Sequence, residues 1–176
     1  MGEADRGLRR TAALVVALAV ALAGCSEEPE RGPAEPTKRV TAVDGSFELS
    51  VPEDWTTMQK ALRDDVVVVE RDPGGTDRVL VSLQRSGTGA EQRAITVSNQ
   101  LSDDGVFCER FDGDETFGDP HLVFDCPVDD GTRQVLVAVV DEGRSALLVF
   151  RTRATTLEST ADLITPILSS FEWTHG

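Results

Sequence analysis

The sequence predicts an α+β fold in which helices flank a twisted antiparallel sheet. Three observations lead to this class. Short β-branched and apolar runs recur along the chain, tight-turn pairs such as Asp-Gly and Glu-Gly separate them, and segments with helical spacing lie between groups of strands. Strands joined by such short turns are antiparallel neighbours, and helices placed between them pack on the sheet.

The first elements are a strand pair and a helix. In RVTAVDGSFELSV, Asp44-Gly45 separates two strand-like runs and is a strong signal for a two-residue hairpin. A helix is expected next, in PEDWTTMQKAL, because Pro52 suits a first helical turn and Asp54 can cap it.

The middle of the chain predicts a hairpin followed by a helix. VVVVERDPGGTDRVLVSLQ has a β-branched run, a Pro-Gly-Gly turn and then an alternating apolar run. Residues 89–103 are expected to form a helix that ends near Asp104-Gly105. Its ragged apolar face consists of Ile95, Val97, Ser98 and Leu101.

The last part of the chain predicts another hairpin and a closing helix. Glu142-Gly143 joins the runs TRQVLVAVVD and RSALLVFRTR as a tight turn. TTLESTADLITPILSSFEW then has nearly helical spacing, and Pro166 is expected to kink or shorten that helix. Phe171 and Trp173 are expected to form a short final strand.

Cys108 and Cys126 are expected to form a disulfide. The segments VFCERF and HLVFDCPV both look like strands, and a turn-rich loop joins them, so antiparallel pairing would bring the cysteines together. The alternative is a redox or metal-binding pair, but the characteristic Cys-x-x-Cys spacing is absent.

The amino terminus has the three parts of an export signal. Arg6, Arg9 and Arg10 precede the apolar run Ala12–Ala23, and Gly24 follows it. The run is shorter than the roughly 20 residues that a membrane-spanning helix needs. Residues 1–24 are therefore expected to be a cleaved signal peptide, with an uncleaved short anchor as the alternative.

The four residues Leu22–Cys25, LAGC, resemble the bacterial lipobox. That resemblance implies a diacylglyceryl group on the Cys25 sulfur, with Cys25 as the mature amino terminus at the extracytoplasmic face of the cell membrane. Residues 25–39 then form a lipidated cysteine and a flexible, proline-bearing tether, and residues 40–176 form the domain. Arg9-Arg10 leaves the choice between general secretion and twin-arginine export open.

The charge balance and the missing motifs exclude several classes of function. A formal net charge of -14 gives no basic surface for nucleic acid and no attraction to anionic headgroups. No motif of a catalytic serine, a phosphate-binding loop or a zinc protease occurs, and we expect no cofactor and no metal. His121 is expected at a strand edge and His175 near a loose end.

Two further groups of residues have alternative interpretations. One acidic stretch begins like a calcium loop, but Phe117 and Val123 occupy its glycine and bidentate-glutamate positions, so a solvated loop is expected. Trp55 and Trp173 are expected to pack in the core, with a ligand pocket as the alternative. The acidic stretch contains Asp112, Asp114, Glu115 and Asp119.

Two segments resemble PsbP-like domains. GSFELSVPEDW is similar to their opening strand and Pro-x-x-Trp turn, and ITPILSSFEW is similar to their final helix and strand. With the lipobox, the chain resembles actinobacterial lipoproteins of the LpqN/LpqT type. This resemblance implies a PsbP-like sheet flanked by helices. Members of the fold bind partners, as the photosystem subunit PsbP and a Ran-binding nuclear-transport factor do, and no catalytic residues carry over.

The expected function is that of a monomeric, non-catalytic, lipid-anchored binding protein. Its expected partner is a protein or lipid component of the cell envelope. One alternative is a carrier of a lipid or small apolar ligand between the sheet and the helices. A second alternative is a hydrolase that uses carboxylates such as Asp112 and Asp125.

Overall fold

The structure, a computed structural model, describes the folded unit of the chain in seven stretches. These are residues 35–42, 44–59, 66–71, 76–84, 89–111, 122–128 and 130–174. All of them belong to the unit Gly32–Gly176. The predicted signal peptide, Cys25 and most of the predicted tether lie outside the described residues.

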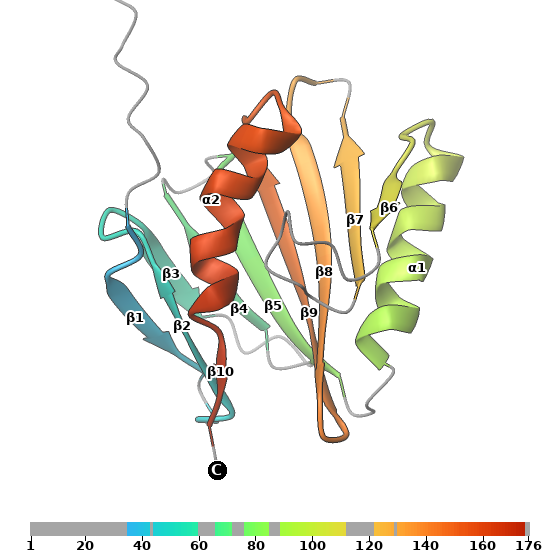
Figure 1. The fold of residues 1–176 in the computed structure, drawn as a ribbon. Coiled ribbons are helices and arrows are strands. Elements are labelled where there is room, and N and C mark those ends of the chain that lie inside the picture. The colour runs from blue at the N-terminus through green and yellow to red at the C-terminus, as the bar shows by residue number, and fades with distance from the viewer. Residues whose placement is uncertain are drawn as a thin grey trace, which may run out of the picture. The chain divides into compact units, whose positions relative to one another are not determined.

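A seven-stranded sheet, antiparallel at every pairing, forms the centre of this unit (Figure 1). Most neighbours in it are also neighbours in sequence, as the predicted hairpins require, and the exception is the pairing of β5 with β9. In spatial order the strands are β3 (Thr56–Gln59), β4 (Val66–Glu70), β5 (Arg78–Gln84), β9 (Arg144–Thr152), β8 (Arg133–Asp141), β7 (Leu122–Pro127) and β6 (Glu109–Phe111).

A small sheet and two helices complete the described part of the fold (Figure 1). In the small sheet, β2 lies between β1 and the carboxyl-terminal strand β10. The helices are α1 and α2, so the predicted α+β class is confirmed. The bounds are β1 (Lys38–Thr41), β2 (Phe47–Val51), β10 (Glu172–Trp173), α1 (Gly89–Asp103) and α2 (Leu157–Ser169).

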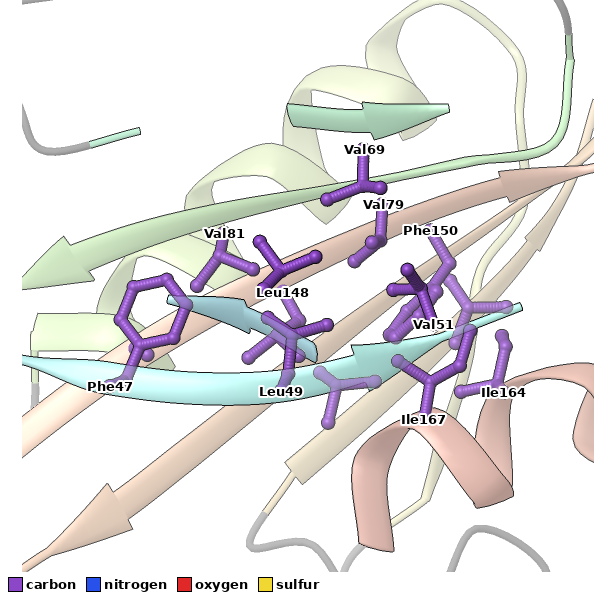
Figure 2. Packing of buried hydrophobic residues seen from close by; sticks show 14 of the residues in the cluster. Phe47, Leu49, Val51, Val69, Val79, Val81, Leu148, Phe150, Ile164 and Ile167 are labelled. Carbon is purple, nitrogen blue, oxygen red and sulfur yellow. The ribbon is translucent and has the colours of Figure 1, made fainter. Parts of the chain in front are cut away.

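Successive residues of the main strands point to opposite faces of the sheet, and an apolar cluster lies on each face. On one face, β2 and α2 pack against β-branched and aromatic residues of the main sheet, including Val79 and Phe150, and Figure 2 shows this cluster. On the other face, α1 packs against the remaining set, including Leu136 and Leu147. The main sheet is therefore covered by α2 and the small sheet on one side and by α1 on the other.

The first predicted helix is wrong. Where PEDWTTMQKAL suggested a helix starting at Pro52, the chain makes a turn and enters strand β3. The backbone N–H of Trp55 donates to the Pro52 carbonyl at 3.0 Å, and Thr56 and Thr57 then pair with β4. β-branched residues fit a strand well, and pairing with a strand further along the chain overrides a local helix signal.

The other helix predictions are confirmed, with one difference each. In α1 the buried positions are Ala90, Ala94 and Ser98, whose small side chains let the helix approach the sheet closely. α2 continues past Pro166 to Ser169. Neither helix is long and apolar enough to cross a membrane, within the part of the chain described.

The folded unit includes the end of the segment expected to be a tether. β1 begins at Lys38, two residues before the expected boundary at Val40. The Lys38 ammonium donates to the Trp55 carbonyl at 2.6 Å, and Arg39 forms an ion pair with Glu48 at 3.1 Å. These contacts hold Lys38 and Arg39 in the small sheet.

Candidate functional site

A disulfide joins Cys108 and Cys126 at the β6 end of the main sheet. Glu109 pairs with Asp125 across β6 and β7, so the two cysteines occupy the next opposed positions of the same ladder. Their Cα atoms are 4.2 Å apart and their sulfurs are bonded. Cys126 is fully buried in the cluster beneath α1, so the bond fixes the start of β6 to the interior.

The end of α1 fixes the same segment from the other side. Gly105 has a φ of +89°, which favours glycine, and its N–H donates to the Ser102 carbonyl at 3.0 Å. The N–H of Val106 donates to the Leu101 carbonyl at 2.8 Å, and both side chains pack on the buried cluster. This pattern is a Schellman motif, which stops the helix and sets the direction of the following residues.

Phe107 projects from this fixed segment into solvent. Its side chain is 83% exposed, and among the described residues no other large hydrophobic side chain is exposed. Val106 on one side packs against the α1 cluster, and Cys108 on the other is held by the disulfide. Phe107 is therefore exposed on a backbone that is anchored on both sides.

The charged residues around Phe107 are mostly acidic, and the nearby cation Arg110, in β6, lies over the ring of Phe124. Asp103 and Asp104 lie at the end of α1, Glu109 begins β6, and all three are exposed. Neither Asp103 nor Asp104 forms an ion pair with the described residues, and the last turn of α1 contains no basic residue. We call Asp103, Asp104, Phe107 and Glu109 the Phe107 surface.

A buried ion pair lies next to Glu109, on the same face of the sheet as that residue, because Asp125 is its partner in the β6–β7 ladder. Asp125 is 3% exposed, and its carboxylate pairs with the Arg133 guanidinium. Arg133 also donates to the Thr155 carbonyl at 3.2 Å, while Asp125 Oδ1 has no hydrogen-bond partner among the described residues. Burial raises the pKa of Asp125 above its ordinary value; Arg133 opposes this rise and Glu109 adds to it.

Comparisons with known proteins identify the fold of the domain. No family model matches the chain, and no curated protein matches it. Among solved structures, cyanobacterial PsbP (CyanoP) from Synechocystis sp. PCC 6803 superposes with a TM-score of 0.52 at 14% identity, covering 80% of this chain and 94% of that one. The protein has a PsbP-like fold.

A second solved structure is similar over a part of its length. It comes from Bacteroides thetaiotaomicron VPI-5482 and has a TM-score of 0.45 at 10% identity. The alignment covers 80% of this chain, but this chain spans only 49% of that protein.

The two segments that resemble PsbP-like domains lie side by side in this fold. The first contains β2, and the second contains α2 and β10. β10 pairs with β2, Trp173 standing opposite Phe47, and the ring of Phe171 stacks on that of Phe47 at 5.4 Å. The resemblance therefore rests on residues that build one structural unit.

Both tryptophans pack against other side chains. Trp55 is 2% exposed in the core beneath β1 and β2, as expected. Trp173 meets Phe171 edge to face at 5.2 Å, and the Arg144 guanidinium lies 4.9 Å from its ring centre. The packed interpretation of both residues agrees with these contacts.

Several residues singled out in the sequence lie outside the described part of the chain. Within the described stretches, no group of three or more His, Cys, Asp or Glu side chains could hold a metal ion. The residues outside are Cys25, Asp112, Asp114, Glu115, Asp119, His121 and His175.

Sequence reasoning missed Phe107, although a signal for it was present. VFCERF was recognised as strand-like, and successive residues of extended chain point to opposite sides. If Cys108 points inward to reach Cys126, Val106 points the same way and Phe107 points outward. The alternation alone thus assigns Phe107 to the exposed side.

Proposed function

We propose that the protein is a lipid-anchored, non-catalytic binding protein of the LpqN/LpqT type, facing the outside of the cell membrane and binding a protein of the cell envelope. The observation that carries this proposal is the lipobox Leu22–Cys25, placed directly before a tether and a folded PsbP-like unit. A diacylated cysteine supplies the two acyl chains that stable anchoring requires. The domain is then held near envelope proteins.

The packing of the interior favours protein binding over ligand carriage. A carrier needs a cavity between the sheet and the helices, but the described side chains there are in contact with one another (Figure 2). Those less than 2% exposed include Phe47, Leu49, Val51, Phe150, Ile164 and Ile167. Binding therefore uses the outer surface of the domain.

The position of Asp125 also favours a binding role. A carboxylate hydrolase needs two acids that converge where substrate and water can reach them. Asp125 is buried and neutralised by Arg133, and Asp112 lies outside the described residues. We therefore assign the Asp125–Arg133 pair to the structure of the domain.

Replacement of the anchoring residue tests the location. The variant Cys25→Ser should move from the membrane fraction to the soluble fraction, because it loses its lipid. The double variant with Cys108→Ser and Cys126→Ser should stay with the membrane, since it retains Cys25. If Cys25→Ser remains membrane-bound after a carbonate wash, the proposed anchor is wrong.

Native mass spectrometry of residues 26–176, purified without detergent from the organism of origin, tests the choice between binding protein and carrier. The proposal expects the mass of the bare polypeptide. A reproducible additional mass in the lipid range would favour the carrier and identify its ligand.

A further inference from the structure

We propose that the Phe107 surface is the docking site for the protein partner, and that the partner offers an apolar pocket bordered by basic side chains. This inference rests on the proposed function, because it names the surface and the chemistry by which that binding takes place. Three independent features of the structure carry it: the exposure of Phe107, the rigidity of its backbone, and the charge around it.

The exposure of Phe107 is the first feature. The side chain of Phe107 is 83% exposed, so its apolar ring lies in water. Single exposed hydrophobic residues are common on protein surfaces. Aromatic side chains that fill a pocket at the centre of an interface carry a large share of the binding energy. Phe107 has the size and the accessibility of such an anchor.

The rigid presentation of Phe107 is the second feature. The Schellman hydrogen bond from Val106 to Leu101 and the disulfide of Cys108 fix the backbone on both sides of Phe107. Binding through a pre-ordered residue loses little conformational entropy, so more of the contact energy appears as affinity. An exposed aromatic residue in a loosely held loop would lack this advantage.

The local charge is the third feature. Asp103 and Asp104 lie at the carboxyl-terminal end of α1, where the helix dipole already places negative charge. Among the described residues, no cation pairs with them. Arginine or lysine side chains on a partner would neutralise this charge. Acids at the negative end of a helix dipole are locally unfavourable, and such unfavourable placements concentrate at functional sites.

The same charge decides between classes of partner. A membrane with anionic headgroups would be repelled by Asp103, Asp104 and Glu109. A second copy of the chain, with its formal net charge of -14, would bring like charges together at this surface. A basic protein surface is the class of partner that remains.

Site-specific photocrosslinking in living cells of the organism of origin tests the proposal with the full-length, anchored protein. A photoreactive phenylalanine analogue is placed at position 107 and, in separate strains, at Asp162 and at Arg153. Asp162 is an exposed residue on α2, which packs against β2, and Arg153 is an exposed residue beyond β9. We expect one protein to be crosslinked from position 107 and not from position 162.

The crosslinked protein is then identified by mass spectrometry, and its soluble part is purified for binding measurements. Phe107→Ala should raise Kd about thirtyfold, the effect of losing an interface anchor. The double variant with Asp103→Lys and Asp104→Lys should raise Kd tenfold or more at low salt, about 1.4 kcal/mol of binding free energy, and less at high salt. A matched control, Glu158→Lys with Asp162→Lys on α2, should leave Kd within about twofold.

Each other outcome overturns a defined part of the proposal. Protein crosslinks from positions 153 or 162 but none from 107 would refute the docking site and leave the proposed function standing. No protein crosslink from any position would refute the proposed function itself. A crosslink from 107 to lipid or to a second copy of the chain would refute the basic protein partner, as would an unchanged Kd for Phe107→Ala.

Discussion

At the scale of single residues, Asp125 shows how the interior tolerates a charge. The carboxylate is buried and keeps one cationic partner, Arg133, which is itself held by the Thr155 carbonyl. Removing one member of a buried ion pair leaves the other charge uncompensated and costs about 3–5 kcal/mol of stability. The pair thus constrains β7 and β8 at the end nearest the disulfide.

The raised pKa of Asp125 predicts a pH dependence of stability. The folded protein binds a proton on this carboxyl at a higher pH than the unfolded chain does, whose value is near 3.8. The stability of the wild type relative to Asp125→Asn should therefore fall as pH rises through the raised pKa, and then become constant. Urea unfolding of both proteins from about pH 4 to about pH 8 measures this difference.

Asp130 provides a control of opposite sign. Hydrogen bonds from Thr132 hold the pKa of the Asp130 carboxyl below its ordinary value, so its contribution is present above pH 3.8 and lost as pH falls. The stability of the wild type relative to Asp130→Asn should decrease towards acid. A difference that rises with pH for Asp125→Asn would contradict the burial of that charge.

At the scale of elements, the beginning of β1 determines where the domain can be shortened. The N–H of Thr37 donates to the Val51 carbonyl at 3.1 Å, and Lys38 reaches the Trp55 carbonyl. A chain that starts at Val40 loses both hydrogen bonds and the exposed Arg39–Glu48 ion pair. Because each such hydrogen bond contributes about 0.5–1.5 kcal/mol, the loss should total roughly 1–3 kcal/mol.

The comparison is between chains that start at Gly32 and at Val40, each followed by thermal and urea unfolding. The longer chain should have the stability of residues 26–176, and the shorter one a lower Tm. Equal melting temperatures would show that the first residues of β1 contribute nothing to the fold.

The carboxyl-terminal end of α1 predicts a substitution that stabilises the domain. Asp103→Lys and Asp104→Lys replace unfavourable charges with favourable ones, so each should add about 0.3–1 kcal/mol to the free energy of unfolding. Glu91→Lys in the first turn of the same helix should lower it by a similar amount, because an acid is favourable there. Urea unfolding at low ionic strength measures all three; a destabilised lysine variant would contradict the dipole argument.

The hairpins and the later helices could be predicted from sequence because their signals are local. Asp44-Gly45 marks the hairpin between β1 and β2, and Gly45 has a φ of +71°, although β1 ends at Thr41 and β2 begins at Phe47, so the connection is longer than the expected two residues. The helix prediction for the segment after Pro52 was wrong for the opposite reason. The pairing of this segment with β4 depends on residues further along the chain. The pairing of β5 with β9 has no local signal either.

At the scale of the whole molecule, the disulfide is the covalent link between distant parts of the chain. The cysteines are 18 residues apart, and closing a loop of this size stabilises the fold by roughly 3 kcal/mol in the chain-entropy model. The double variant with Cys108→Ser and Cys126→Ser should be less stable by about that amount in urea unfolding. Wild-type protein in a strong reductant should show the same loss; unchanged stability in both would contradict it.

The candidate site was predictable in part, for physical reasons. Cysteine spacing between two strand-like runs led to the disulfide, since opposed positions in a ladder bring such residues together. The exposure of Phe107 could follow from strand alternation, but its rigidity depends on the Schellman motif and on the burial of Cys126. These depend on tertiary packing, which the sequence pattern alone does not contain.

The pairing of β10 with β2 has a consequence for the order in which the chain acquires its structure during synthesis. Ser170 donates to Ser50, 120 residues earlier, and Thr174 donates to Gly45. At a synthesis rate of about 5–20 residues per second, the carboxyl-terminal partners of β2 are synthesised roughly 6–24 s after β2 itself. During that interval the apolar side chains of Phe47, Leu49 and Val51 lack their cover, so the nascent chain needs protection from aggregation until translation ends.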